Sequence, residues 1–91
     1  MTELAAKVIS TPTGWLASPR KDFVLLFIKN PKSLISLPTI ITELWYSTKR
    51  GIPKKLKNKR ELDYQSAIET WNELLTNGWE LINDPINERD P

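Results

Sequence analysis

Residues 62–79 read LDYQSAIETWNELLTNGW, and they carry the clearest structural pattern in the chain. Their apolar residues recur three and four positions apart, which is the spacing of one face of an α-helix. These residues are Tyr64, Ala67, Ile68, Trp71, Leu74 and Leu75. Asp63 is a favoured N-cap residue, and Gly78 suits the left-handed backbone position that ends many helices. The pattern therefore predicts an amphipathic helix from Asp63 to Asn77.

Four other segments have the composition of β-strands. A short strand begins at residues 14–16, and a polar break separates it from residues 23–28. This second segment is apolar throughout and rich in aromatic and aliphatic residues, which is typical of a central strand. Residues 39–47 alternate as a third strand, and residues 79–82 form a short last one. We therefore expect three strands before the helix and one after it.

The alternation in residues 39–47 indicates which face of the third strand is buried. One face holds Ile40, Thr42, Leu44 and Tyr46, and the other holds Ile41, Glu43, Trp45 and Ser47. Because Glu43 carries a charge, we expect the second face to be the solvent side. Trp45 is then partly exposed, or else it packs under a loop.

One apolar helix stripe needs one sheet face to cover it, which predicts an α+β fold. We expect a single two-layer domain, with a three- to four-stranded, mostly antiparallel sheet and one long helix packed on it. The order of elements is β-β-β-α-β. The domain spans residues 13–83, between a flexible N-terminal lead-in at 1–12 and a flexible acidic tail at 84–91.

The composition excludes several chemistries. The chain has 91 residues and contains neither Cys nor His, so it has no zinc finger, thiol nucleophile or imidazole base. Its three glycines are isolated, so it has no glycine-rich phosphate loop. Glu69 and Glu73 lie four residues apart on the polar face of the helix, which is the position of solvated carboxylates. We expect a protein that is not an enzyme and that needs no cofactor or metal.

The chain carries no pattern of export or membrane insertion. Its longest apolar run has six residues, at 23–28, and a membrane-spanning helix needs about 20. The absence of Cys excludes a disulfide framework. We therefore expect a cytoplasmic protein with no membrane contact.

Charge is concentrated in residues 49–60, KRGIPKKLKNKR. This segment holds seven of the 13 basic residues and no acidic one, and the rest of the chain has six basic and 11 acidic residues. The basic residues are Lys49, Arg50, Lys54, Lys55, Lys57, Lys59 and Arg60. We expect a basic loop between the third strand and the helix.

Such a cluster is the usual electrostatic footprint of an anion-binding site, and RNA or DNA is the partner it favours. Trp45 and Tyr46 directly precede the cluster and are candidates for stacking on a splayed base. A simpler interpretation is a solvated loop, in which Lys59 or Arg60 pairs with Glu61 or Glu69. A third is a protein–protein adaptor that meets an acidic protein surface, and an open sheet edge also allows a homodimer.

A spaced series of residues resembles a known family. The series comprises Gly14, Trp15, Leu16, an apolar strand at 24–27, the basic stretch 56–60, Leu62, Ala67, Trp71, Leu74, Gly78 and Trp79. Over residues 14–82 it resembles a small uncharacterised family, domain of unknown function 1651, from marine picocyanobacteria (Prochlorococcus and Synechococcus). The resemblance implies a cytoplasmic setting in such a cell and no particular activity. It also implies that Lys57, Lys59 and Arg60 belong to the pattern of the domain.

Overall fold

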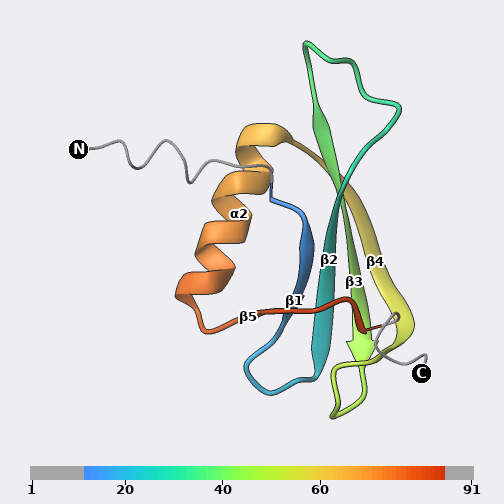
Figure 1. Ribbon diagram of the computed structural model, residues 1–91, viewed down its shortest axis with the longest axis vertical. Helices are drawn as coiled ribbons and strands as arrows, with labels where there is room; N and C mark the ends of the chain where they lie inside the picture. Colours follow the sequence, from blue (N-terminus) through green and yellow to red (C-terminus); the bar gives the residue numbers. More distant parts are fainter. Residues whose placement is uncertain (1–11, 86–91) are drawn as a thin grey trace.

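The computed structural model of the protein describes residues 12–85, and Figure 1 shows how its elements are arranged. The strands are β1 (Gly14–Ala17), β2 (Phe23–Lys29), β3 (Thr39–Ser47), β4 (Pro53–Asp63) and β5 (Glu80–Ile82), and the helix is α2 (Tyr64–Thr76). The lead-in expected at 1–12 and the tail expected at 84–91 lie almost wholly outside the described residues.

The strands form one antiparallel sheet in the order β4-β3-β2-β1-β5, and α2 packs against one of its faces (Figure 1). This arrangement confirms the two-layer α+β fold that the helix stripe predicted. The described part of the chain has the order β-β-β-β-α-β, which is one strand more than predicted. Helix α2 connects the two edge strands β4 and β5, so it crosses the sheet from one edge to the other.

The segment predicted as a basic loop forms the longest strand of the described sheet. It pairs with β3 from Ser47↔Pro53 to Thr39↔Asp63, so the prediction of a loop was wrong for residues 53–60. Lysine and asparagine have a low intrinsic preference for strands. However, β3 presents a second edge whose N–H and C=O groups need partners. The chain reversal after β3 brings the basic segment to that edge, and backbone pairing outweighs the low local preference.

The reversal between β3 and β4 is a tight, well-bonded turn. The Thr48 N–H donates to the Ile52 carbonyl, and the Gly51 N–H donates to the Thr48 carbonyl, both at 2.9 Å. Gly51 has a φ of 83°, in the left-handed region that residues with a Cβ rarely adopt. The turn therefore favours glycine at this position, and it leaves Lys49 and Arg50 exposed.

Helix α2 begins and ends as the sequence predicted. The Asp63 carboxylate accepts a hydrogen bond from the Ser66 N–H at 3.1 Å, which satisfies a free donor of the first turn. At the other end, the N–H groups of Gly78 and Trp79 donate to carbonyls of the last turn in a Schellman motif. Gly78 has a φ of 94°, as this motif requires.

The core between helix and sheet centres on fully buried side chains from three strands and the helix. They are Leu16, Phe27, Ile40 and Ala67. The Phe27 ring meets the Trp71 ring edge-on, with 5.0 Å between the ring centres. Tyr64 and Leu74 of the predicted stripe also pack here, so the inward direction of these stripe residues is confirmed.

The other face of the sheet differs from the prediction. None of its four β3 residues is fully exposed, whereas Tyr46, predicted on the buried face, is 40% exposed. A second apolar cluster covers this face: Trp15, Ala17 and Val24 are buried, and Leu26, Trp45 and Ile82 pack against them. The reason is that β2 is apolar at successive positions, so both faces of the sheet carry side chains that avoid water.

Candidate functional site

The basic residues of segment 49–60 are all exposed, and the fold spreads them along one side of the sheet. Lys49 and Arg50 lie in the turn after β3. The others lie on β4 and are Lys54, Lys55, Lys57, Lys59 and Arg60. Among the described strands β4 is an edge strand, with β3 as its one neighbour. We call residues 49–60 the basic edge.

The alternation of the strand divides the basic edge between the two faces of the sheet. Arg60 lies on the face that α2 covers, where it lines a hollow of about 210 Å³ beside the helix. Lys59 pairs with Glu43 on the opposite face, and its Nζ lies 4.0 Å from the Glu43 carboxylate. The sequence had suggested Glu61 or Glu69 as the partner of Lys59. The ion pair forms with Glu43 instead because the register places the two residues directly opposite each other.

Two lysines of the basic edge sit at irregular positions in the strand. The pairing with β3 skips Lys57 at one point and Lys54 at another, so each is the extra residue of a β-bulge. The Lys57 Nζ lies 5.7 Å from the centre of the Tyr46 ring, which is within cation–π distance. The lysine at this bulge is therefore also the one whose charge lies over the Tyr46 ring.

The two aromatic candidates for stacking lie on opposite faces of the sheet. Tyr46 shares a face with Phe23, and the centres of their rings are 5.5 Å apart. Trp45 is half-buried in the second apolar cluster, and its Nε1 donates to the Glu43 Oε1 at 3.2 Å. The fold therefore brings Tyr46, and not Trp45, together with Lys55 and Lys57.

The fold adds two basic residues that the sequence reading did not connect with this site. Arg20 and Lys21 lie in the turn between β1 and β2, at the same end of the sheet as the β3–β4 turn (Figure 1). The β1–β2 turn is joined to the end of β3 by a hydrogen bond from the Ser47 N–H to the Asp22 carbonyl, at 2.9 Å. In a sheet of consecutive antiparallel strands, alternate turns lie at the same end. A correct count of the strands therefore predicts that these two turns lie at one end of the sheet.

The basic edge also has a structural explanation. An edge strand with free backbone groups invites pairing with other chains, and proteins protect such edges with lysines, proline and β-bulges. Strand β4 has all three features, since it begins at Pro53 and carries two bulges among its lysines. Lysines on β4 are therefore expected even if nothing binds there.

Carboxylates occupy the opposite end of β4. Hydrogen bonds from the Thr39 hydroxyl and the Asn30 amide, at 2.6 and 2.7 Å, lower the pKa of the Glu61 carboxyl. Hydrogen bonds from the Ser66 hydroxyl and N–H lower the pKa of Asp63 in the same way. Both groups are thereby held in the charged form, so the charge of β4 changes sign along its length.

Metal-binding clusters and membrane-spanning helices are both absent from the described residues. Residues 12–85 contain no group of three or more Asp, Glu, His or Cys side chains placed to hold a metal ion. In the same range, no helix is long and apolar enough to cross a membrane.

The fold and its surface define a small antiparallel α+β domain with one basic edge. The family described as "Protein of unknown function (DUF1651)" matches residues 13–86, which is most of the chain. The chain belongs to this family, as the series of residues that begins with Gly14 and Trp15 predicted. No curated protein and no solved structure matches it.

Proposed function

We propose that this protein is a small, non-enzymatic, cytoplasmic binding module that docks on single-stranded RNA or DNA in a cyanobacterial cell. The supporting observation is the gathering of basic side chains at one end of the sheet. They come from the β1–β2 turn, the β3–β4 turn and the first half of β4. The two turns contain Arg20, Lys21, Lys49 and Arg50 against a single acidic residue, Asp22.

Edge protection explains only part of this charge. It accounts for lysines on β4, whose backbone groups need guarding, but not for the basic residues of the two turns. Each Lys or Arg that neutralises a phosphate releases counterions, so a cluster of this kind binds a polyanion without base-specific geometry. The distribution of charge over three segments therefore favours a binding surface over edge protection alone.

Tyr46 supplies the aromatic part of the proposed surface. The Tyr46 ring is exposed and lies beside the Phe23 ring. The Lys57 Nζ lies over the Tyr46 ring, and Lys55 pairs with Tyr46 in the register of the two strands. A base stacked on Tyr46 would have cations beside it for the flanking phosphates. We assign stacking to Tyr46 and direct charge neutralisation to Lys49, Arg50, Lys54, Lys55 and Lys57. Lys59 and Arg60 fall outside this surface, because Lys59 pairs with Glu43 on the opposite face and Arg60 lies farther along β4, beside α2.

The backbone at Lys21 gives independent support. This residue has a φ of 62°, a conformation that costs a residue with a Cβ about 1–2 kcal/mol and that glycine adopts freely. Such strain tends to occur at functional positions. The backbone at this position favours glycine, yet the residue is a lysine. This supports a functional role for the charge of Lys21.

The test is fluorescence anisotropy of labelled single-stranded RNA and DNA, titrated with protein at several salt concentrations. We expect log K to fall with log salt, with a slope of about −3 to −5. The triple variant Lys49→Gln/Lys55→Gln/Lys57→Gln should reduce the slope by about 2, because three phosphate contacts are lost. Tyr46→Leu should weaken binding about tenfold and leave the slope unchanged.

The matched control is Lys29→Gln/Lys32→Gln/Lys59→Gln. It removes the same charge from residues outside the proposed surface, so the slope should change by less than about 1. Equal losses in the two triple variants would mean diffuse attraction and no defined site. The absence of binding by the unmodified protein at low salt would contradict the proposal.

A second candidate function is a protein–protein adaptor, and the free edge of β4 favours it. An extended segment of a partner can add as a strand to such an edge. The lysines on both faces of β4 favour an acidic partner. They also disfavour a dimer through two β4 strands, because basic side chains would then lie opposite one another.

Affinity capture with and without nuclease separates the two functions. A nucleic-acid module loses its captured material on nuclease treatment, whereas an adaptor retains one protein partner. Sedimentation velocity tests the homodimer, and the charge of β4 predicts that no dimer forms through two β4 strands.

A further inference from the structure

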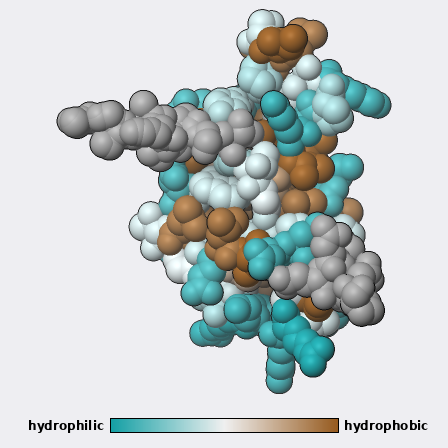
Figure 2. All heavy atoms as spheres, in the orientation of Figure 1, coloured by the Kyte–Doolittle hydropathy of each residue, from teal (hydrophilic) through white to brown (hydrophobic). Residues whose placement is uncertain are grey.

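The loop between β2 and β3, residues 30–38, exposes three large apolar side chains. Leu34, Ile35 and Leu37 are 65%, 99% and 67% exposed. The loop projects beyond both α2 and β4 at the end of the sheet opposite the basic turns (Figure 1). Figure 2 shows its apolar surface gathered at this tip. We call these three residues the apolar tip.

The apolar tip is held in a bonded conformation. The Ser33 N–H and hydroxyl donate to the Asn30 carbonyl at 3.2 and 2.9 Å, and the Leu37 N–H donates to the Leu34 carbonyl at 3.0 Å. The Asn30 amide in turn donates to Thr39 and to Glu61. These hydrogen bonds connect the base of the loop to β3 and β4. They hold the loop in the conformation that exposes the apolar tip.

Folding gains little from this apolar surface. Tips of loops are usually built from Gly, Asn, Asp, Ser and Pro, whose side chains stay hydrated. Ile35 touches almost nothing in the protein, so its side chain contributes no burial to the core. A group of apolar side chains that a hydrogen-bonded loop holds in an exposed position indicates an interaction surface.

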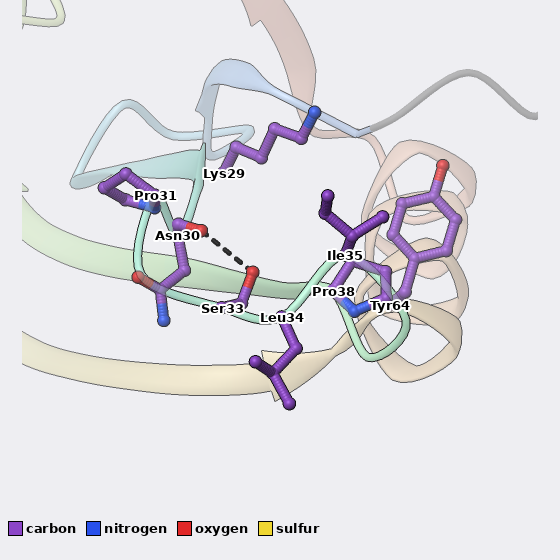
Figure 3. Close-up of a pocket in the computed structure, with 8 residues that line it drawn as sticks. All are labelled: Lys29, Asn30, Pro31, Ser33, Leu34, Ile35, Pro38 and Tyr64. Carbon is purple, nitrogen blue, oxygen red and sulfur yellow. Dashed lines mark hydrogen bonds between the residues drawn. The ribbon is translucent and has the colours of Figure 1, made fainter.

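The shape and charge of the loop point to a lipid surface. Ile35 and Leu34 extend to opposite sides of the loop (Figure 3), which is a convex arrangement that needs no shaped pocket in a partner. The loop and its flanking residues at 29–39 contain Lys29 and Lys32 and no acidic residue. Lysines set behind apolar side chains match anionic headgroups above an acyl layer.

The neighbouring residues suit the same environment. Behind the tip lies an open hollow of about 560 Å³, lined by the loop and by Tyr64 at the start of α2 (Figure 3). Tyrosine is enriched at the boundary between headgroups and acyl chains, because its ring is apolar and its hydroxyl is polar. The carboxylates of Glu61 and Asp63 lie near the C-terminal end of β4, where hydrogen bonds from Thr39 and Ser66 hold them.

We infer that the apolar tip inserts into the surface of an anionic bilayer, with Lys29 and Lys32 at the headgroups. The sequence-based expectation of no membrane contact rested on the lack of a long apolar run, which excludes a spanning helix but not a small exposed tip. One small apolar loop supports weak and reversible binding only, since even a single acyl chain anchors a protein marginally.

The absence of Cys in the chain makes a direct test possible. Ile35→Cys, labelled with a polarity-sensitive fluorophore, is mixed with phosphatidylcholine vesicles with and without phosphatidylserine. We expect a blue shift with the anionic vesicles and a weaker one with the neutral vesicles. Leu81→Cys is the matched control, since Leu81 is an exposed leucine on β5, and it should show no shift.

Labelled Arg50→Cys reports contact through the basic turns. A shift at position 50 without one at 35 would mean electrostatic docking through the other end, and it would overturn the inference. A silent label at position 35 would also overturn it and would direct attention to a protein partner for the tip. In cosedimentation, Leu34→Ser/Ile35→Ser/Leu37→Ser should lower vesicle binding about tenfold or more, and Leu81→Ser should not.

Discussion

Strand β3 joins two connections of opposite chemistry. The β2–β3 loop before it exposes Leu34, Ile35 and Leu37, and the β3–β4 turn after it exposes Lys49 and Arg50. Both connect neighbouring antiparallel strands of the same sheet, so the fold does not require either composition. In small domains the strands provide the scaffold, and the connections carry interaction chemistry.

The two connections also differ in what maintains their conformation. The β3–β4 turn depends on one backbone position, Gly51, and on the hydroxyl of Thr48. The β2–β3 loop depends on side chains from three segments, Asn30, Thr39 and Glu61. The basic turn is therefore sensitive to substitution at one residue, whereas the apolar loop is sensitive to the charge of a carboxylate.

The largest expected effect tests whether the apolar tip is separate from the core. Phe27→Ala should lower the free energy of unfolding by about 3–5 kcal/mol, because Phe27 is fully buried against Trp71. Ile35→Ser should change it by less than about 0.5 kcal/mol, because Ile35 is almost fully exposed. Urea unfolding followed by tryptophan fluorescence measures both.

If Phe27→Ala does not fold, Phe27→Leu provides the comparison, with an expected loss of about 1 kcal/mol. A large loss of stability in Ile35→Ser would show that the tip packs in solution. The apolar loop would then not be a free surface comparable to the basic turn at the other end of the sheet.

The next effect concerns the basic turn. Gly51→Ala should destabilise the fold by about 1–2 kcal/mol, because alanine is strained at a φ of 83°. Space is not the reason, since an added Cβ would have its nearest neighbour, the Ile82 side chain, at 3.9 Å. Ser36→Ala in the apolar loop is the control, with less than about 0.5 kcal/mol expected. A neutral Gly51→Ala in urea unfolding would mean that the turn can rearrange.

A third prediction separates stability from binding at the basic turns. Lys21→Gly should raise the free energy of unfolding by up to about 1 kcal/mol, because relief of strain exceeds the added entropy of the unfolded chain. The same variant should weaken nucleic-acid binding. Lys32→Gly at the other end lacks the strained backbone and should not stabilise. Unchanged affinity in Lys21→Gly would remove this residue from the proposed surface.

The smallest effect is a pH dependence at the base of the apolar loop. The pKa of Glu61 is lower in the folded protein than its ordinary value of 4.5, so the folded state favours the charged form. This contribution to stability is present above the ordinary value and is lost as the pH falls through the lower, folded pKa. Asp63 behaves in the same way around its ordinary value of 3.8.

As the pH is lowered through the acid range, the urea midpoint of unfolding should therefore decrease. The decrease should be smaller in Glu61→Gln, because glutamine does not titrate. Asp63→Asn is the companion variant for the helix N-cap. Identical pH profiles in the unmodified protein and Glu61→Gln would show that Glu61 does not hold the loop.

Much of the architecture followed from local pattern. The helix and both of its ends were predictable because a period near 3.6, Asp63 and Gly78 all indicate the same segment. The bounds of β3 were predictable for the same kind of reason, from a period of two. The family was also recognised from a spaced series of residues, and the match over residues 13–86 confirms it.

The candidate site was only partly predictable. The sequence identified the basic residues, but not their strand, because Pro53, five Lys or Arg residues and the register shift at Lys57 break the alternation. The half-buried position of Trp45 depends on a second apolar cluster, which forms only when β1, β2, β3 and β5 are side by side.

The sequence by itself determined the helix, its caps, most of the strands and the concentration of charge, since these depend on residues close together in the chain. Only the tertiary structure decided that residues 53–63 form an edge strand, that Arg20 and Lys21 lie at the same end as Lys49 and Arg50, and that the apolar tip stands clear of the core. The physical reason is that backbone pairing across the sheet joins segments far apart in sequence, and the free energy of that pairing overrides local preference.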